Sequence, residues 1–356
     1  MRRNYFIALL GIMIVSLSVF GIVHRSSAQS NPALHVAASI QPLAGIVSEI
    51  GGVQAEVSIL LPEGIEPHAF TLTQSVIDTA NAADMLVLTG HFDWEEELAT
   101  QVGKPYITLD DYKVFGATLL PLHGYESPLS SSIDGGRQDP YDENLHGYWL
   151  LPQNAIAIAN ATRALCSSIN STYSQYWQNR FAEFVSEVSK LEAFISQQKL
   201  VHQLGDTNVI ITFPAEAYIA ETLGLQVKGL LMEAENVFIS GPELITIEQA
   251  LQNGSINLIL ASDIAQLQAA GEFAQQLSAD SSVPLVWVRA VFSLLENYVG
   301  LMAYNTGVII TGISGGIPPA VDFLTISMPV IIIAAVLGTI AVIELVLLLR
   351  CTRAQD

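Results

Sequence analysis

The chain has 356 residues, of which 51% are hydrophobic, and a formal net charge of −20 at pH 7. This length accommodates two modest domains. Nucleic acid is recognised by basic surfaces, so the strongly acidic composition excludes it as a partner. Two long apolar runs, one near each end of the chain, account for the excess of hydrophobic residues.

The first apolar run has the layout of a secretory signal. Two arginines precede the run Tyr5–Val23, and the small residues Ser26 and Ala28 follow at positions suited to cleavage. We therefore expect a signal peptide over residues 1–28. An uncleaved anchor helix is the alternative, because the run is long for a signal.

The second apolar run, Ile326–Leu349, is long enough to cross a bilayer as a transmembrane helix. Arg350 and Arg353 follow it, and basic residues next to a span favour the cytoplasmic side. We expect residues 29–325 to lie outside the cell membrane and a short tail to lie inside. Cys166 is then the one cysteine outside, which leaves no intrachain disulfide there.

Three N-x-S/T sequons begin at Asn160, Asn170 and Asn253. On a cell surface with N-glycosylation, each is a candidate acceptor, so the chain is a candidate glycoprotein. An archaeal surface protein fits both the sequons and a C-terminal membrane anchor.

Strand-like and helix-like segments alternate over residues 34–150, which predicts a βα lobe with a mostly parallel sheet. The expected strands are 34–39, 55–61, 85–89 and 106–109, and the expected helices are 43–50, 73–81 and 94–102. Residues 112–145, rich in serine, glycine and acidic residues, are predicted to form a long surface loop.

A helical region over residues 151–204, interrupted near Asn170, is expected to connect this lobe to a second one over 205–310. The second lobe is expected to have strands 208–212, 225–231, 257–261 and 285–288, and helices 215–223, 243–252, 265–278 and 292–308. A linker over 311–325 follows. The predicted fold class is α/β, with two βα lobes joined by a long helical backbone.

Histidines stand at several predicted loops. In open α/β sheets, ligands bind beyond the carboxyl ends of the strands, and neutral imidazole is a good metal ligand. His68 follows the second strand on a proline-flanked loop, and His146 leads into the helical region. His91 follows the third strand and is a weaker candidate, while His123 in the long loop offers only a transient contact.

Five segments resemble one known family. Ala38-Ser-Ile-Gln-Pro-Leu, Leu61-Pro-Glu-Gly-Ile-Glu-Pro-His-Ala-Phe and Ala82-Ala-Asp-Met-Leu-Val-Leu-Thr-Gly resemble the first lobe of zinc/manganese ABC-transporter solute-binding proteins, the ZnuA/TroA-type or cluster A-I proteins. His146-Gly-Tyr-Trp-Leu-Leu-Pro-Gln-Asn-Ala is similar to the family's second histidine motif. Pro214-Ala-Glu-Ala-Tyr-Ile-Ala-Glu-Thr-Leu-Gly-Leu is similar to its second-lobe helix.

The resemblance implies an extracytoplasmic subunit of a metal-ion ABC importer, not an enzyme. It implies a divalent cation, zinc or manganese, as cargo in a cleft between the lobes, and an ABC permease with its ATPase as partners. Residues His68 and His146 match the family's motifs and are expected to be metal ligands.

Other expected ligands of the family are missing. Phe213 stands where the family has a third histidine, and Arg289 where it has a late acidic ligand. Glu216, one helical turn beyond Phe213, and Asp263, after the strand 257–261, are the predicted replacements, because both could direct a carboxylate into the cleft. They would complete a metal site with the two histidines.

Two alternatives remain. The missing ligands favour a scaffold whose metal site has decayed and which serves adhesion or partner binding. An extracellular hydrolase has little support, because the sequence contains neither a Gly-x-Ser-x-Gly elbow nor a His-Glu-x-x-His motif.

Overall fold

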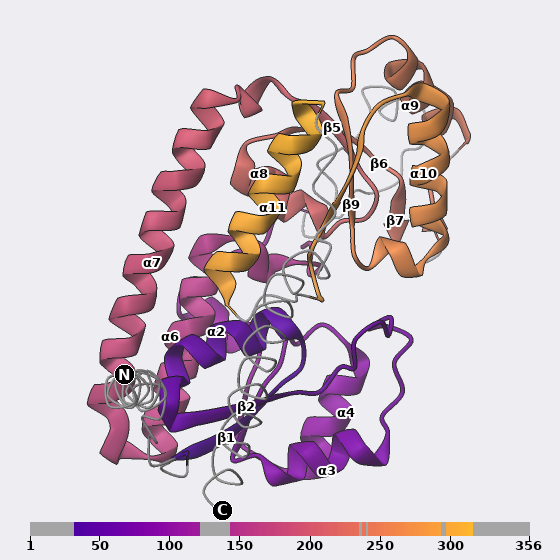
Figure 1. Cartoon of the computed structure of the whole chain (residues 1–356). Helices are drawn as coiled ribbons and strands as arrows, with labels where there is room; N and C mark the ends of the chain where they lie inside the picture. The colour runs from indigo at the N-terminus through magenta and orange to yellow at the C-terminus, as the bar shows by residue number, and fades with distance from the viewer. Residues whose placement is uncertain (1–31, 122–142, 235–236, 240, 293–296, 316–356) are drawn as a thin grey trace, which may run out of the picture.

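The chain forms two α/β lobes, stacked one above the other in Figure 1 and joined by long helices. The computed structural model describes residues 32–121, 143–234, 237–239, 241–292 and 297–315. The predicted signal peptide (1–28) and the predicted C-terminal span (326–349) lie outside these residues. Within the described part of the chain, no helix has both the length and the hydropathy needed to cross a membrane.

The N-terminal lobe is built on a four-stranded parallel sheet with strand order β2-β1-β3-β4. The strands are β1 (Leu34–Ala38), β2 (Ala55–Ile59), β3 (Met85–Val87) and β4 (Tyr106–Ile107). All of β3 is buried, because helices cover both faces of the sheet, and this explains its uninterrupted apolar sequence. The predicted parallel sheet of the first lobe is confirmed.

The C-terminal lobe repeats this plan with strand order β10-β9-β5-β6, again parallel throughout. Its strands are β5 (Asn208–Ile211), β6 (Gln226–Leu230), β9 (Leu258–Ser262) and β10 (Leu285–Val288). A short antiparallel pair, β7 (Met232–Ala234) and β8 (Val237–Phe238), was not anticipated from the sequence. The alternation of strands and helices therefore predicted both main sheets, but not this extra pair of strands.

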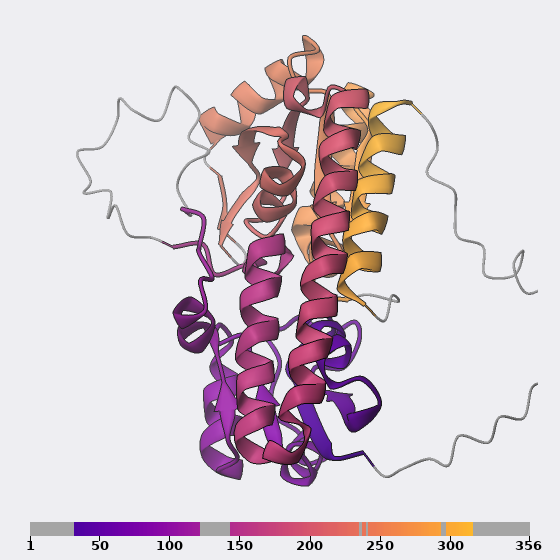
Figure 2. The ribbon, with the colours of Figure 1, turned by 90° about the vertical axis from the view of Figure 1, so that its left-hand side faces the viewer.

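Two helices form the predicted connection between the lobes. α6 (Pro152–Ile169) ends at Asn170, whose side chain accepts a hydrogen bond from the Thr172 amide, and α7 (Ser174–Val201) then runs for 28 residues past both lobes (Figure 2). The apolar positions of α7 face the core: the buried residues are Trp177, Phe184, Val188, Leu191 and Ile195. The long connecting helix is thus confirmed.

The remaining helices cover the faces of the two sheets. They are α2 (Gln41–Gly51), α3 (Gln74–Ala82), α4 (Asp93–Val102), α5 (Leu109–Val114), α8 (Glu216–Leu223), α9 (Gly241–Gln252), α10 (Ala269–Ser281) and α11 (Tyr298–Ile313). α11 begins later than predicted because the Asn297 side chain caps it, accepting a hydrogen bond from the Gly300 amide at 2.7 Å. α5 occupies the start of the region predicted to be a loop.

A segment just before α6 joins the two lobes. The Trp149 indole donates to the Ala290 carbonyl at 2.8 Å, and the Tyr298 hydroxyl donates to the Leu150 carbonyl at 3.1 Å. Gly147 has φ +84°, and a Cβ there would lie 2.9 Å from the Ala215 carbonyl oxygen. Only glycine fits, because the backbones of the two lobes approach each other at this point.

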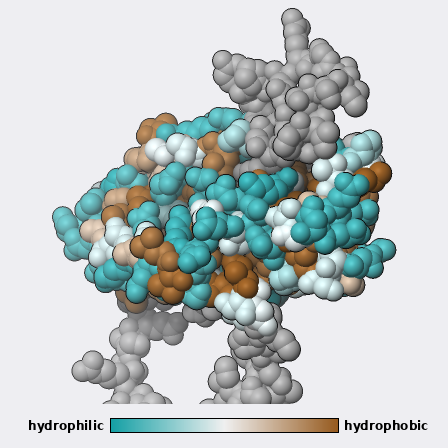
Figure 3. Space-filling view, turned by 90° about the horizontal axis from the view of Figure 1, so that it is seen from above, coloured by the Kyte–Doolittle hydropathy of each residue, from teal (hydrophilic) through white to brown (hydrophobic). Residues whose placement is uncertain are grey.

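The end of the molecule that carries the C-terminal lobe is seen from above in Figure 3. Teal hydrophilic side chains predominate there, and the brown hydrophobic ones form separate patches. Scattered apolar residues of this kind are ordinary on a protein surface and indicate no particular contact.

Candidate metal centre

Three histidines from different loops meet beside the junction of the lobes. His68 lies between β2 and α3, His91 directly follows β3, and His146 precedes the short 3-10 helix Tyr148–Leu150. One ring nitrogen from each histidine can be chosen so that all three lie within 4.8 Å of one another. The centroids of the His91 and His146 rings are 4.4 Å apart, and those of His68 and His91 are 4.8 Å apart.

Hydrogen bonds fix the three loops relative to one another. The Trp94 indole of α4 donates to the Pro67 carbonyl at 3.1 Å, which holds the loop of His68. The Tyr148 hydroxyl donates to the Thr89 carbonyl at 2.8 Å, which joins the segment of His146 to that of His91. These bonds hold the three histidine-bearing loops together, as a precise binding site requires.

A buried carboxylate, Glu95, shapes the turn that carries His91. Glu95 accepts hydrogen bonds from the Thr89 amide at 2.8 Å and the Thr89 hydroxyl at 2.7 Å. It also accepts from the amides of His91 at 3.1 Å and Phe92 at 3.3 Å. These bonds leave the backbone of His91 little freedom, so its ring stays directed at the other two.

The histidines border a small cavity of about 20 Å³, enough for one water molecule or one ion. The C-terminal lobe closes it with apolar groups, and the Phe213 ring meets the His146 ring edge-on at a centroid distance of 4.8 Å. The described lining is Glu66, Pro67, His68, His91, Phe92, His146, Gly147, Trp149, Phe213, Ala215, Ile264 and Val291.

Nitrogens in this cluster lack hydrogen-bond partners although they are shielded from water. They are both ring nitrogens of His91 and Nδ1 of His146. Burial, reinforced by the neighbouring histidines, lowers the pKa of His91 to about 2 and that of His146 to about 4. Both rings are therefore neutral at pH 7, with lone pairs available to bind a cation.

Glu216 lies elsewhere, at the start of α8, which follows β5. Its fully buried carboxylate accepts hydrogen bonds from the Thr212 hydroxyl at 2.9 Å and from the Phe213 and Ser262 amides, each at 2.6 Å. Burial raises the pKa of Glu216 to about 7. The side chain does not line the cavity, and the structure does not bring it to the three histidines.

Asp263, which follows β9, has a similar arrangement. Its carboxylate accepts hydrogen bonds from the amides of Ala290 at 3.0 Å and Phe292 at 2.8 Å. Burial raises the pKa of Asp263 to about 6, against the opposing effects of these bonds and of nearby Arg289. Neither Asp263 nor Arg289 is among the residues that line the cavity. Of the four side chains predicted as ligands, the structure brings together His68 and His146, and it adds His91.

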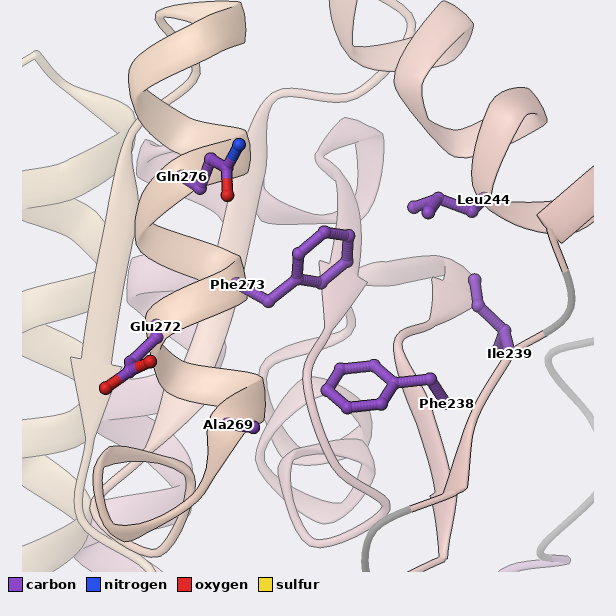
Figure 4. Close-up of a pocket in the computed structure, with 7 residues that line it drawn as sticks. All are labelled: Phe238, Ile239, Leu244, Ala269, Glu272, Phe273 and Gln276. Carbon is purple, nitrogen blue, oxygen red and sulfur yellow. The ribbon is translucent and has the colours of Figure 1, made fainter.

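A second hollow, of about 420 Å³, has a different character (Figure 4). It lies between β8, α9 and α10, where Phe238 and Phe273 face each other edge-on with ring centroids 5.7 Å apart. Glu272 is the one ionisable residue in its described lining. This arrangement provides apolar contact area and does not resemble a metal site.

Three comparisons with known proteins agree with this fold. Residues 36–312 match the family described as zinc-uptake complex component A, periplasmic (ZnuA). The zinc-binding lipoprotein AdcA of Streptococcus pneumoniae is 22% identical over 311 residues, which cover 83% of this chain and 59% of AdcA.

Among solved structures, FpvC of Pseudomonas aeruginosa in complex with Mn²⁺ is 20% identical, with a TM-score of 0.61, covering 79% of this chain and 98% of FpvC. A Mn-bound periplasmic metal-binding protein from Candidatus Liberibacter asiaticus is 14% identical, with a TM-score of 0.60, covering 78% of this chain and 99% of that protein. At these identities the two structures establish the fold alone.

Proposed function

The chain belongs to the ZnuA family of zinc-uptake component A proteins, and we propose that it is the cation-capturing subunit of a divalent-metal ABC importer. It holds zinc or manganese as cargo on the ring nitrogens of His68, His91 and His146, and passes it to an ABC permease driven by an ATPase. This is a binding role in transport, and the family is not enzymatic.

The observation that supports this proposal is the convergence of the three imidazoles. Their nitrogens lie within 4.8 Å of one another, and those of His91 and His146 include buried atoms with no partner. Burying a polar atom without a hydrogen bond is costly, and a bound cation offsets that cost at one nitrogen of each ring by taking its lone pair. Neutral imidazoles also bind a cation without first releasing a proton.

The ligand set proposed here differs from the set predicted by sequence. Glu216 and Asp263 would have to give up their hydrogen bonds to backbone amides before either could reach an ion. We therefore assign both residues to holding the loops of the C-terminal lobe. Three imidazoles suit zinc better than manganese, which prefers oxygen ligands. AdcA is named a zinc-binding protein, which supports the same cargo.

Calorimetry with zinc and with manganese on the purified full chain tests the proposal, after bound metal has been removed by a chelator. We expect each chain to bind one ion, with higher affinity for zinc than for manganese. The double variant His68→Ala/His146→Ala should bind neither metal. The control is His35→Ala, which removes an exposed histidine on β1. Absence of binding by the parent chain would leave the decayed-site scaffold as the better interpretation.

We further propose that a signal peptide over residues 1–28 directs the chain outward and that the helix 326–349 anchors it. Residues 34–150 and 205–310 then form the two extracytoplasmic lobes, and the sequons at Asn160 and Asn170 in the connecting helical region and at Asn253 in the second lobe are exposed to glycosylation. Protease added to intact cells should remove the lobes and spare a tag placed after Asp356. Digestion of that tag from outside would reverse the proposed orientation.

A further inference from the structure

Glu66 lies two residues before His68 and lines the same cavity as the three histidines. One of its carboxylate oxygens, Oε2, accepts a hydrogen bond from the Ala69 amide at 2.6 Å. The other, Oε1, is buried and has no hydrogen-bond partner. One carboxylate oxygen thus binds its own loop, and the other has no partner within the described part of the chain.

The state of the half-buried Glu66 differs from that of the fully buried acids near the junction. Glu95, Glu216 and Asp263 each accept hydrogen bonds on both oxygens. Among the described residues that line the cavity, Glu66 is also the single acid. A buried carboxylate oxygen without a partner is costly, so its position calls for a cationic or hydrogen-bonding ligand.

We propose that Oε1 of Glu66 is the oxygen ligand of the captured cation, which completes a site of three imidazoles and one carboxylate. This inference rests on the proposed function and deepens it. All four ligands come from the N-terminal lobe and the segment that follows it. The oxygen lies outside the tight group of nitrogens, so the Glu66 side chain turns toward the ion as it binds.

The ligand set specifies the class of cargo. Three neutral imidazoles and one carboxylate reduce the charge of a divalent ion from +2 to +1, which favours its transfer into a partly buried cavity. Four nitrogen and oxygen donors suit tetrahedral zinc, whereas magnesium and calcium require six or more ligands, mostly oxygen. The site therefore selects zinc-class ions over the abundant alkaline-earth ions.

The test compares Glu66→Gln with Glu63→Gln in the full chain. Glutamine keeps the size of the side chain and an oxygen for the Ala69 amide, but it lacks the charge. Glu63 is an exposed acid on the same loop, so its variant makes the same charge change away from the cavity. Zinc affinity is measured by competition with a chelator, and the ligand geometry by the visible absorption of bound Co²⁺.

We expect Glu66→Gln to weaken zinc binding by roughly 10- to 100-fold and to change the cobalt spectrum, with Glu63→Gln like the parent. Glu66→Asp, which restores the charge, should recover part of the affinity. Unchanged zinc affinity in Glu66→Gln, or weaker affinity with an unchanged cobalt spectrum, would overturn the ligand assignment while leaving the proposed function intact. A parent chain that binds no zinc would instead overturn both.

Discussion

The two lobes use the same device, in each case after a strand in the middle of the parallel sheet. In the N-terminal lobe, β3 leads to Thr89, and the buried Glu95 accepts hydrogen bonds from Thr89 and from the amide of His91. In the C-terminal lobe, β5 leads to Thr212, and the buried Glu216 accepts from Thr212 and from the amide of Phe213. Each carboxylate fixes the turn between a strand and the following helix.

The difference lies in the side chain that each turn presents to the cavity. One turn presents the imidazole of His91, and the other presents the phenyl ring of Phe213. The scaffold is therefore shared, whereas the capacity to bind metal is concentrated in one lobe. A carboxylate beside such a turn can be a structural element of the loop, even where a metal site is nearby.

Removal of the His91 imidazole should have the largest effect on zinc affinity. His91→Ala leaves two of the three nitrogens, so we expect zinc affinity to fall by more than the roughly 100-fold that loss of an outer partner can cost. Competition with a chelator measures the zinc affinity of His91→Ala, and His35→Ala is the control. Parent-like binding would instead indicate that the ion uses oxygen ligands from the C-terminal lobe.

The two carboxylates allow a matched comparison. Glu95→Gln disturbs the turn of His91 and should weaken zinc binding by roughly 10- to 100-fold. The loss of zinc affinity in Glu216→Gln should be smaller than this. Both variants place an amide against backbone N–H groups, so each should lose about 1–3 kcal/mol of stability. Calorimetry and urea unfolding separate the two effects. Equal losses of affinity would show that both turns support the metal.

The pH dependence of binding should be shallow. An ordinary histidine, with a pKa near 6.5, must lose a proton to bind metal at pH 5. The pKa of His91, about 2, and that of His146, about 4, lie below this range, so both imidazoles are already neutral there. Between pH 7 and pH 5, we expect a slope of log Kd against pH of at most about one, where three ordinary histidines would give up to about three. A slope near three would show that these histidines titrate normally.

Replacement of the Phe213 ring, which closes the cavity from the C-terminal lobe, should have the smallest effect on zinc affinity. Phe213→Leu keeps an apolar side chain at the cavity and removes no ligand, so zinc affinity should change by less than about threefold. Repacking of this buried position should cost about 1 kcal/mol of stability. Calorimetry and thermal unfolding measure both. A large loss of affinity would show that the Phe213 ring itself contributes to holding the ion.

The sequence predicted the fold well because its strands are short and apolar, its long helix repeats apolar residues at helical spacing, and glycine, proline and polar residues separate the elements. It also singled out His68 and His146 through their motifs, and the structure brings these two rings together. His91 ranked lower because a single histidine after a strand is usually solvated, and only the folded chain shows that Tyr148 and Glu95 direct its turn toward the other two.

The acids were harder to assign. A carboxylate just after a strand can point toward a ligand or back toward the amides of its own loop, and the order of residues does not distinguish these two directions. The structure shows that Glu216 and Asp263 turn back toward amides. Glu66 was not recognised because nothing in its sequence position indicates an oxygen that is buried and unpaired.

The continuous helix α7 has a consequence for the time an ion spends on the protein. Its 28 residues extend for about 42 Å along both lobes, and such a helix resists bending. Wide separation of the lobes is therefore an improbable route of escape for the ion. We expect the dwell time of the cargo to depend instead on brief openings of the loop that carries His68 and Glu66, and under the proposed function a permease that engages that loop would shorten it.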